Sequence, residues 1–146
     1  MPADPTPRPP KKNRSAPAPQ PAARRRSILV AEDDDAVREF VRLVLEQAGF
    51  TVTTAPNGRA AGDLFAADPF AFDLVLTDVV MPFATGVELA ARVRATRPEL
   101  LVLFMSAFPG GPGLAPEPLP PDEPLLEKPF SLVKLLEVVN AALGTP

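Results

Sequence analysis

Polar side chains stand at the ends of several short apolar segments of this sequence. They are carboxylates after the first and third segments, a hydroxyl after the fourth and an ammonium after the fifth: Glu32, Asp33, Asp34, Asp78, Ser106 and Lys128. Two carboxylates about 4 Å apart repel each other by roughly 4 kcal/mol at an effective dielectric of about 20. If the fold gathers these side chains, the carboxylates therefore need a cation.

The residue types narrow the choice of cation and of reaction. The sequence contains no histidine and no cysteine, so a metal site would consist of oxygen ligands, which favour Mg²⁺. Mg²⁺ beside a carboxylate, an ammonium and a hydroxyl is suited to phosphoryl transfer, where catalysis is mostly positioning and charge neutralisation. A carboxylate can also act as a nucleophile and form an aspartyl phosphate, and Asp78 is our candidate for that acceptor.

Composition excludes several other classes of protein. Without cysteine there are no disulfides and no thiol catalysis, and without histidine the commonest general base is missing. A chain of 146 residues, 46% of them apolar, suffices for one domain with a core. Its longest apolar run, LLVLFM, is far shorter than the roughly 20 residues that span a bilayer. We therefore expect a cytoplasmic protein without membrane insertion.

Short apolar segments alternate with segments of helical periodicity from Ser27 onward. SILVA, FTVTTA, DLVLTD, LLVLFMS and PLLE predict five strands. Helices are expected at 35–48, 57–68, 85–97 and 131–143. This alternation indicates a doubly wound α/β fold with a five-stranded parallel sheet. In such sheets ligands bind beyond the carboxyl ends of the strands, so we expect the polar side chains named above to meet there.

The ends and faces of two helices can also be predicted. Asp34 or Asp35 can cap the first helix, because a carboxylate there accepts hydrogen bonds from the first turn. In the last helix, Leu132, Leu135 and Val139 recur at the spacing of a single apolar face.

Four segments together resemble one known family. In their order and spacing, ILVAEDDDAVREF, LVLTDVVMP, VLFMSAF and LLEKPF resemble the receiver domain of bacterial two-component response regulators. LFMS and LLEKPFS are closest to the receivers of hybrid sensor kinases. The resemblance implies a flavodoxin-like receiver over residues 27–146, with strand order 2-1-3-4-5.

The resemblance also implies a metal site. It makes Asp78 the phosphorylation site and a metal ligand. Asp33 becomes a direct Mg²⁺ ligand, Glu32 a ligand through water, and the backbone carbonyl of Val80 a further contact. Asp34 is an additional candidate ligand.

The same resemblance implies a switch. Ser106 becomes the hydroxyl that turns toward the phosphoryl group, and Lys128, before an expected cis peptide at Pro129, pairs with a phosphoryl oxygen. Leu125 stands where the family usually has an aromatic residue that rotates on activation. Val80 and a second apolar residue, Phe108, stand on the path of the hydrolytic water. We expect a long-lived phosphoryl group, because apolar side chains do not orient water.

Two segments depart from a typical receiver. Ten of the seventeen residues at 108–124 are proline or glycine, so we expect a loop there and a fourth helix that is missing or much shortened. Residues 1–26 hold eight prolines and seven Lys or Arg against one acid. We expect a disordered basic tail, either solvated or in contact with an acidic partner, and no sequence-specific nucleic-acid binding.

These observations predict a single-domain response regulator, since the sequence given ends soon after the last helix. Its partner would be a sensor histidine kinase or a histidine phosphotransfer protein, and its output would be contact with an unknown downstream protein. Turnover of an external substrate is not expected. One alternative is a binding module whose basic tail the receiver gates, and another is a phosphate sink for a kinase. A third, an Asp-nucleophile phosphatase, lacks the usual second acid, because Val80 stands in its place.

Overall fold

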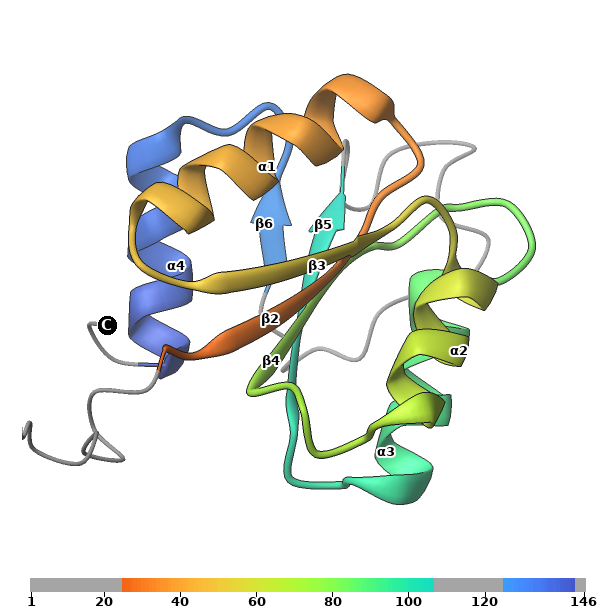
Figure 1. The fold of residues 1–146 in the computed structure, drawn as a ribbon. Helices are drawn as coiled ribbons and strands as arrows, with labels where there is room; N and C mark the ends of the chain where they lie inside the picture. The colour runs from red at the N-terminus through yellow and green to blue at the C-terminus, as the bar shows by residue number, and fades with distance from the viewer. Residues whose placement is uncertain (1–24, 107–124, 144–146) are drawn as a thin grey trace, which may run out of the picture.

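A computed structural model describes residues 25–106 and 125–143. In this part of the chain, five parallel strands form one sheet in the order β3-β2-β4-β5-β6, with four helices around it (Figure 1). Numbered along the chain, this is the predicted order 2-1-3-4-5, so the flavodoxin-like topology is confirmed. The elements are β2 Ser27–Ala31, α1 Asp35–Gln47, β3 Thr51–Ala55, α2 Gly58–Ala67, β4 Leu74–Asp78, α3 Gly86–Thr96, β5 Leu101–Ser106, β6 Leu125–Glu127 and α4 Leu132–Leu143.

Helices cover both faces of the sheet. Figure 1 shows α1 and α4 on one side and α2 and α3 on the other. Alternate residues of a strand point to opposite faces, so Leu29 and Val75 pack in the core under α2 and α3. Ile28 and Leu76 pack in the second core, under α1 and α4. This explains why the central strands read as continuous apolar runs.

Side-chain caps fix where the helices begin. Asp34 caps α1 and accepts a hydrogen bond from the backbone of Val37, which decides between the two predicted caps. Asn57 caps α2 in the same way. At α3, Thr85 and Glu88 form a reciprocal capping box. These caps set the points at which the chain turns from strand to helix.

The last helix differs in one detail from its predicted face. Leu135 and Val139 are fully buried in the core beneath α1 and α4. Leu132, the first residue of α4, is 50% exposed.

Several predictions concern segments that lie outside the described residues. These are the loop at 108–124 in place of a fourth helix, including Phe108, and all of the basic tail except Arg25 and Arg26. The backbone carbonyl of Arg26 already accepts a bond from Thr51, and its guanidinium donates to the carbonyl of Leu143. Among the described helices, none combines the length and apolar character needed to cross a membrane.

A close backbone approach ties α3 to the end of β4. A Cβ atom at Gly86 would lie 2.2 Å from the backbone oxygen of Asp78, and neither backbone segment can move away cheaply. We expect Gly86→Ala to lower the free energy of unfolding by about 1–3 kcal/mol, as overpacking does. Urea unfolding measures this loss.

A second helical glycine supplies the matched control. A Cβ at Gly62 would meet the guanidinium of Arg92 at 2.2 Å, and this flexible side chain can swing aside. Gly62→Ala should therefore be neutral or stabilising by up to about 1 kcal/mol, the usual gain of alanine in a helix. Equal losses in both variants would contradict the contact assigned to Gly86.

Candidate functional site

The sheet brings three carboxylates together at its carboxyl edge. Strands β2 and β4 are neighbours, with Ala31 opposite Thr77, so the residues that follow them meet. Carboxylate oxygens of Glu32, Asp33 and Asp78 all lie within 4.8 Å of one another. Glu32 and Asp78 are buried, whereas Asp33 is exposed.

Lys128 directly follows the edge strand β6, and its side chain reaches this group. Its backbone N–H donates to the carbonyl of Ser106 at 2.8 Å, which continues the pairing of β5 with β6 beyond the last strand residue. Its Nζ atom lies 2.7 Å from Oε1 of Glu32 and 3.2 Å from Oδ2 of Asp78. The peptide bond to Pro129 is cis, as expected. One ammonium therefore pairs with two of the three carboxylates.

Burial dominates the electrostatics of these groups. The pKa of Glu32 is raised to about 7, mainly by burial and in part by the nearby charge of Asp78, while Lys128 and the backbone of Asp34 oppose the shift. Burial also raises the pKa of Asp78, against the influence of Lys128 and with that of Asp33. Burial lowers the pKa of Lys128, but the neighbouring carboxylates of Glu32 and Asp78 raise it by more, so the pKa of the ammonium is raised. The site disfavours its own negative charge.

The donor set fits a hard divalent cation. If all are ionised, three carboxylates and one ammonium leave two negative charges without a counter-charge. The ligand atoms are all oxygens, which suits Mg²⁺. Asp34, the additional candidate ligand, is absent from the cluster, because its carboxylate caps α1.

Ser106 lies at the same edge of the sheet as the acidic cluster. It ends β5 and is 8% exposed. The backbone N–H of Val79 donates to the carbonyl of Met105 at 3.0 Å, which keeps the end of β5 against the end of β4. The strand ends therefore place Ser106 at the same edge of the sheet as Asp78 and Lys128.

Two other predicted positions are described. Val80 follows Asp78 in the loop to α3 and is 48% exposed. Leu125 opens β6 opposite Phe104 and packs against the core under α2 and α3.

The sequence reasoning missed two side chains that bond to the site's backbone. The hydroxyl of Thr77, which is fully buried, donates to the carbonyl of Asp78 at 2.9 Å. The guanidinium of Arg38 donates to the carbonyl of Glu32 at 2.9 Å. A basic residue one turn into the helix after an acidic run was the available signal for Arg38.

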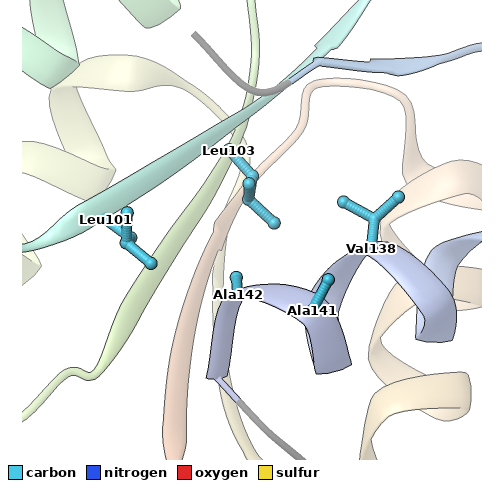
Figure 2. Close-up of a pocket in the computed structure, with 5 residues that line it drawn as sticks. All are labelled: Leu101, Leu103, Val138, Ala141 and Ala142. Carbon is cyan, nitrogen blue, oxygen red and sulfur yellow. The ribbon is translucent and has the colours of Figure 1, made fainter.

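A separate hollow lies between β5 and α4 and is lined by apolar side chains. Figure 2 shows Leu101 and Leu103 of β5 facing Val138, Ala141 and Ala142 of α4. The hollow that these residues line has a volume of about 390 Å³. Leu101 begins β5, whereas Ser106 ends it. This hollow therefore lies away from the acidic site and offers no group for phosphoryl chemistry.

Comparison with known proteins agrees with this geometry. The sequence profile of the response regulator receiver domain matches residues 28–140. The chain belongs to this family. Response regulator receiver protein CpdR of Brucella abortus (strain 2308) is 39% identical over 117 residues, which cover 80% of this chain and 95% of CpdR. This chain is therefore a receiver domain of two-component signalling.

Other relatives are longer proteins or isolated receivers. DNA-binding transcriptional regulator NtrC of Rhizobium meliloti (strain 1021) is 36% identical over 127 residues. The match covers 82% of this chain but only 24% of NtrC, which is a much longer protein. The crystal structure of the receiver domain from hybrid histidine kinase CckA superposes with a TM-score of 0.68. It is 28% identical and covers 80% of this chain and 98% of that one. The similarity to CckA agrees with the resemblance to receivers of hybrid kinases.

Removing one carboxylate tests the charge balance of the site. We expect Asp33→Asn to stabilise the metal-free receiver slightly, because Asp33 adds repulsion at Asp78. The same variant should lose the stabilisation that Mg²⁺ gives the wild type, about 1.4 kcal/mol when Mg²⁺ is at ten times its Kd. Thermal unfolding with Mg²⁺ or EDTA measures both effects.

The exposed Asp63 of α2 supplies a control with the same change of charge. Asp63→Asn should keep the full response to Mg²⁺. A full response in Asp33→Asn would contradict the assigned site.

The raised pKa of Glu32 predicts a dependence of stability on pH in EDTA. Between its usual value of 4.5 and about 7, the folded protein keeps a proton that the unfolded chain has lost. The stability of the wild type relative to Glu32→Gln should therefore fall, by up to about 3 kcal/mol, as the pH rises through this window. Urea unfolding of both proteins at pH 4.5–7.5 measures the difference. A constant or rising difference would contradict it.

Proposed function

We propose that this receiver accepts a phosphoryl group on Asp78 from a phosphohistidine of a sensor histidine kinase or a histidine phosphotransfer protein. The observation that carries the proposal is the convergence of three carboxylates within 4.8 Å, two of them paired with Lys128. In this proposal Asp33, Asp78 and the carbonyl of Val80 hold Mg²⁺ directly, and Glu32 holds it through water. The acceptor is thus part of the metal site.

The transfer can be followed atom by atom. A carboxylate oxygen of Asp78 attacks the phosphorus, and the bond between phosphorus and the imidazole nitrogen breaks. The electron pair of that bond stays on the imidazole. Bound Mg²⁺ supplies charge neutralisation for the phosphoryl oxygens.

Two side chains of the receiver then recognise the product. Lys128 exchanges its contact with the Asp78 carboxylate for one with a phosphoryl oxygen. The hydroxyl of Ser106 donates a hydrogen bond to a second phosphoryl oxygen. Ser106 ends β5 and Lys128 directly follows the neighbouring strand β6, and their backbones are hydrogen-bonded. A movement of one residue would therefore also move the other.

The signal would pass through protein contacts in a cytoplasmic phosphorelay. The similarity to CpdR, of which the chain spans 95%, supports signalling by the receiver without an attached output domain. We expect no turnover of phosphate esters, because an apolar residue, Val80, stands two positions after the acceptor. A phosphate sink and a binding module with a gated basic tail are alternatives. Deletion of residues 1–24 without loss of partner binding would count against the second.

Incubation with acetyl phosphate and Mg²⁺ tests the acceptor. Intact-protein mass spectrometry should record the addition of one phosphoryl group in the wild type and in Asp63→Asn, and none in Asp78→Asn or with EDTA. The asparagine amide keeps the shape of the side chain but is a poor nucleophile. Addition that persists in Asp78→Asn would overturn the proposal.

The apolar residue Val80 predicts a slow loss of the phosphoryl group. After removal of the donor, we expect the wild type to keep it for minutes or longer, since Val80 neither orients nor activates water. Val80→Asn should shorten this lifetime severalfold by adding a group that binds water. The decay of the phosphorylated mass over time measures both. Complete loss within seconds in the wild type would contradict the prediction.

A further inference from the structure

The loop between β4 and α3, residues 79–85, contains a strained and exposed aromatic residue. Phe83 has a φ of 72°, in the left-handed region that residues other than glycine rarely adopt. Its side chain is 69% exposed. Burial therefore does not account for a phenylalanine in a conformation that glycine would adopt without strain.

The rest of this loop is packed against rigid backbone. A Cβ at Gly58, the first residue of α2, would lie 2.2 Å from the carbonyl oxygen of Ala84. The N–H of Ala84 donates to the carbonyl of Pro82 at 2.9 Å, and that of Gly86 to the carbonyl of Val79 at 2.8 Å. Helix α2 thus lies directly against the loop that begins at the acceptor.

One side-chain contact joins α2 to the strained residue. The guanidinium carbon of Arg59, in the first turn of α2, lies 5.1 Å from the centroid of the Phe83 ring. This is the geometry of a cation–π interaction, which attracts the cation to the ring face. The contact draws the ring toward α2 and so favours the backbone conformation that Phe83 adopts.

We propose that Arg59 and Phe83 are positioning residues for the acidic site. Phe83 is five residues after Asp78 and three after Val80 in the same short loop. Fixing its backbone fixes the direction of the Val80 carbonyl, which the proposed function assigns to the metal. The inference rests on that function and extends it to the residues that set the metal affinity.

The exposure of Arg59 and Phe83 distinguishes a positioning role from a contribution to overall stability. Arg59 and Phe83 are both exposed and belong to neither buried cluster. Replacing Phe83 with glycine removes the ring and the strain together, so the fold should lose little stability. A role confined to stability predicts no effect on the site from such a change, whereas a positioning role predicts weaker metal binding.

The test measures Mg²⁺ binding and loop dynamics in the whole chain. The variants are Phe83→Gly, Arg59→Ala and their combination, with Arg59→Lys and Phe83→Tyr as conservative replacements. Titration with Mg²⁺, followed by amide NMR shifts, gives the Kd. Amide hydrogen exchange in EDTA reports on residues 79–86 without any metal.

Each single variant should raise the Mg²⁺ Kd about threefold to tenfold and speed exchange in the loop, while the unfolding temperature changes by less than about 3 °C. The double variant should resemble either single one, because both remove the same contact. Arg59→Lys and Phe83→Tyr should stay within about twofold of wild type, since both keep a cation and a ring.

An unchanged Kd in Phe83→Gly and Arg59→Ala, or additive effects in the double variant, would overturn the positioning role. Failure of the proposed function looks different. In that case the wild type would bind no Mg²⁺, whereas hydrogen exchange in EDTA would still report whether Arg59 and Phe83 hold the loop.

Discussion

The mutual repulsion of carboxylates at the carboxyl edge of the sheet is the constraint on which the rest of the structure depends. Glu32 and Asp78 are buried beside Asp33, and burial raises the pKa of both. Lys128 offsets part of this charge and leaves the rest for a divalent cation. A site that disfavours its own charge is suited to a divalent cation, which is the place that we propose for Mg²⁺.

The fold gives three consecutive acidic residues different positions and roles. After β2 the chain turns into α1, so Glu32 lies inside, Asp33 faces the cluster from the surface, and Asp34 caps the helix. A run of acids that looks uniform in the sequence thus has three physical roles. Parallel pairing of β5 with β6 then brings Lys128 across the sheet to the same edge. Each site residue ends a strand or comes within two residues of its end, because the carboxyl ends of neighbouring parallel strands meet at one edge of the sheet.

Much of this could be predicted from the sequence. Apolar runs and helical periodicity predicted the strands, the helices and the sheet, and the strand ends predicted that Asp78 and Lys128 would meet. The choice of Asp34 as the cap needed the backbone dihedral angles. Side chains that bond to distant backbone, such as Arg38, and the strain at Phe83 leave no periodic signal in the sequence.

We propose that Asp78 becomes phosphorylated because a metal ion and Lys128 compensate its charge. Borohydride reduction converts an aspartyl phosphate to homoserine, so peptide mapping after treatment with acetyl phosphate identifies the modified residue directly. We expect homoserine at position 78 when Mg²⁺ is present and unmodified aspartate when EDTA replaces it. Homoserine at another acid, or equal conversion with and without Mg²⁺, would contradict the account.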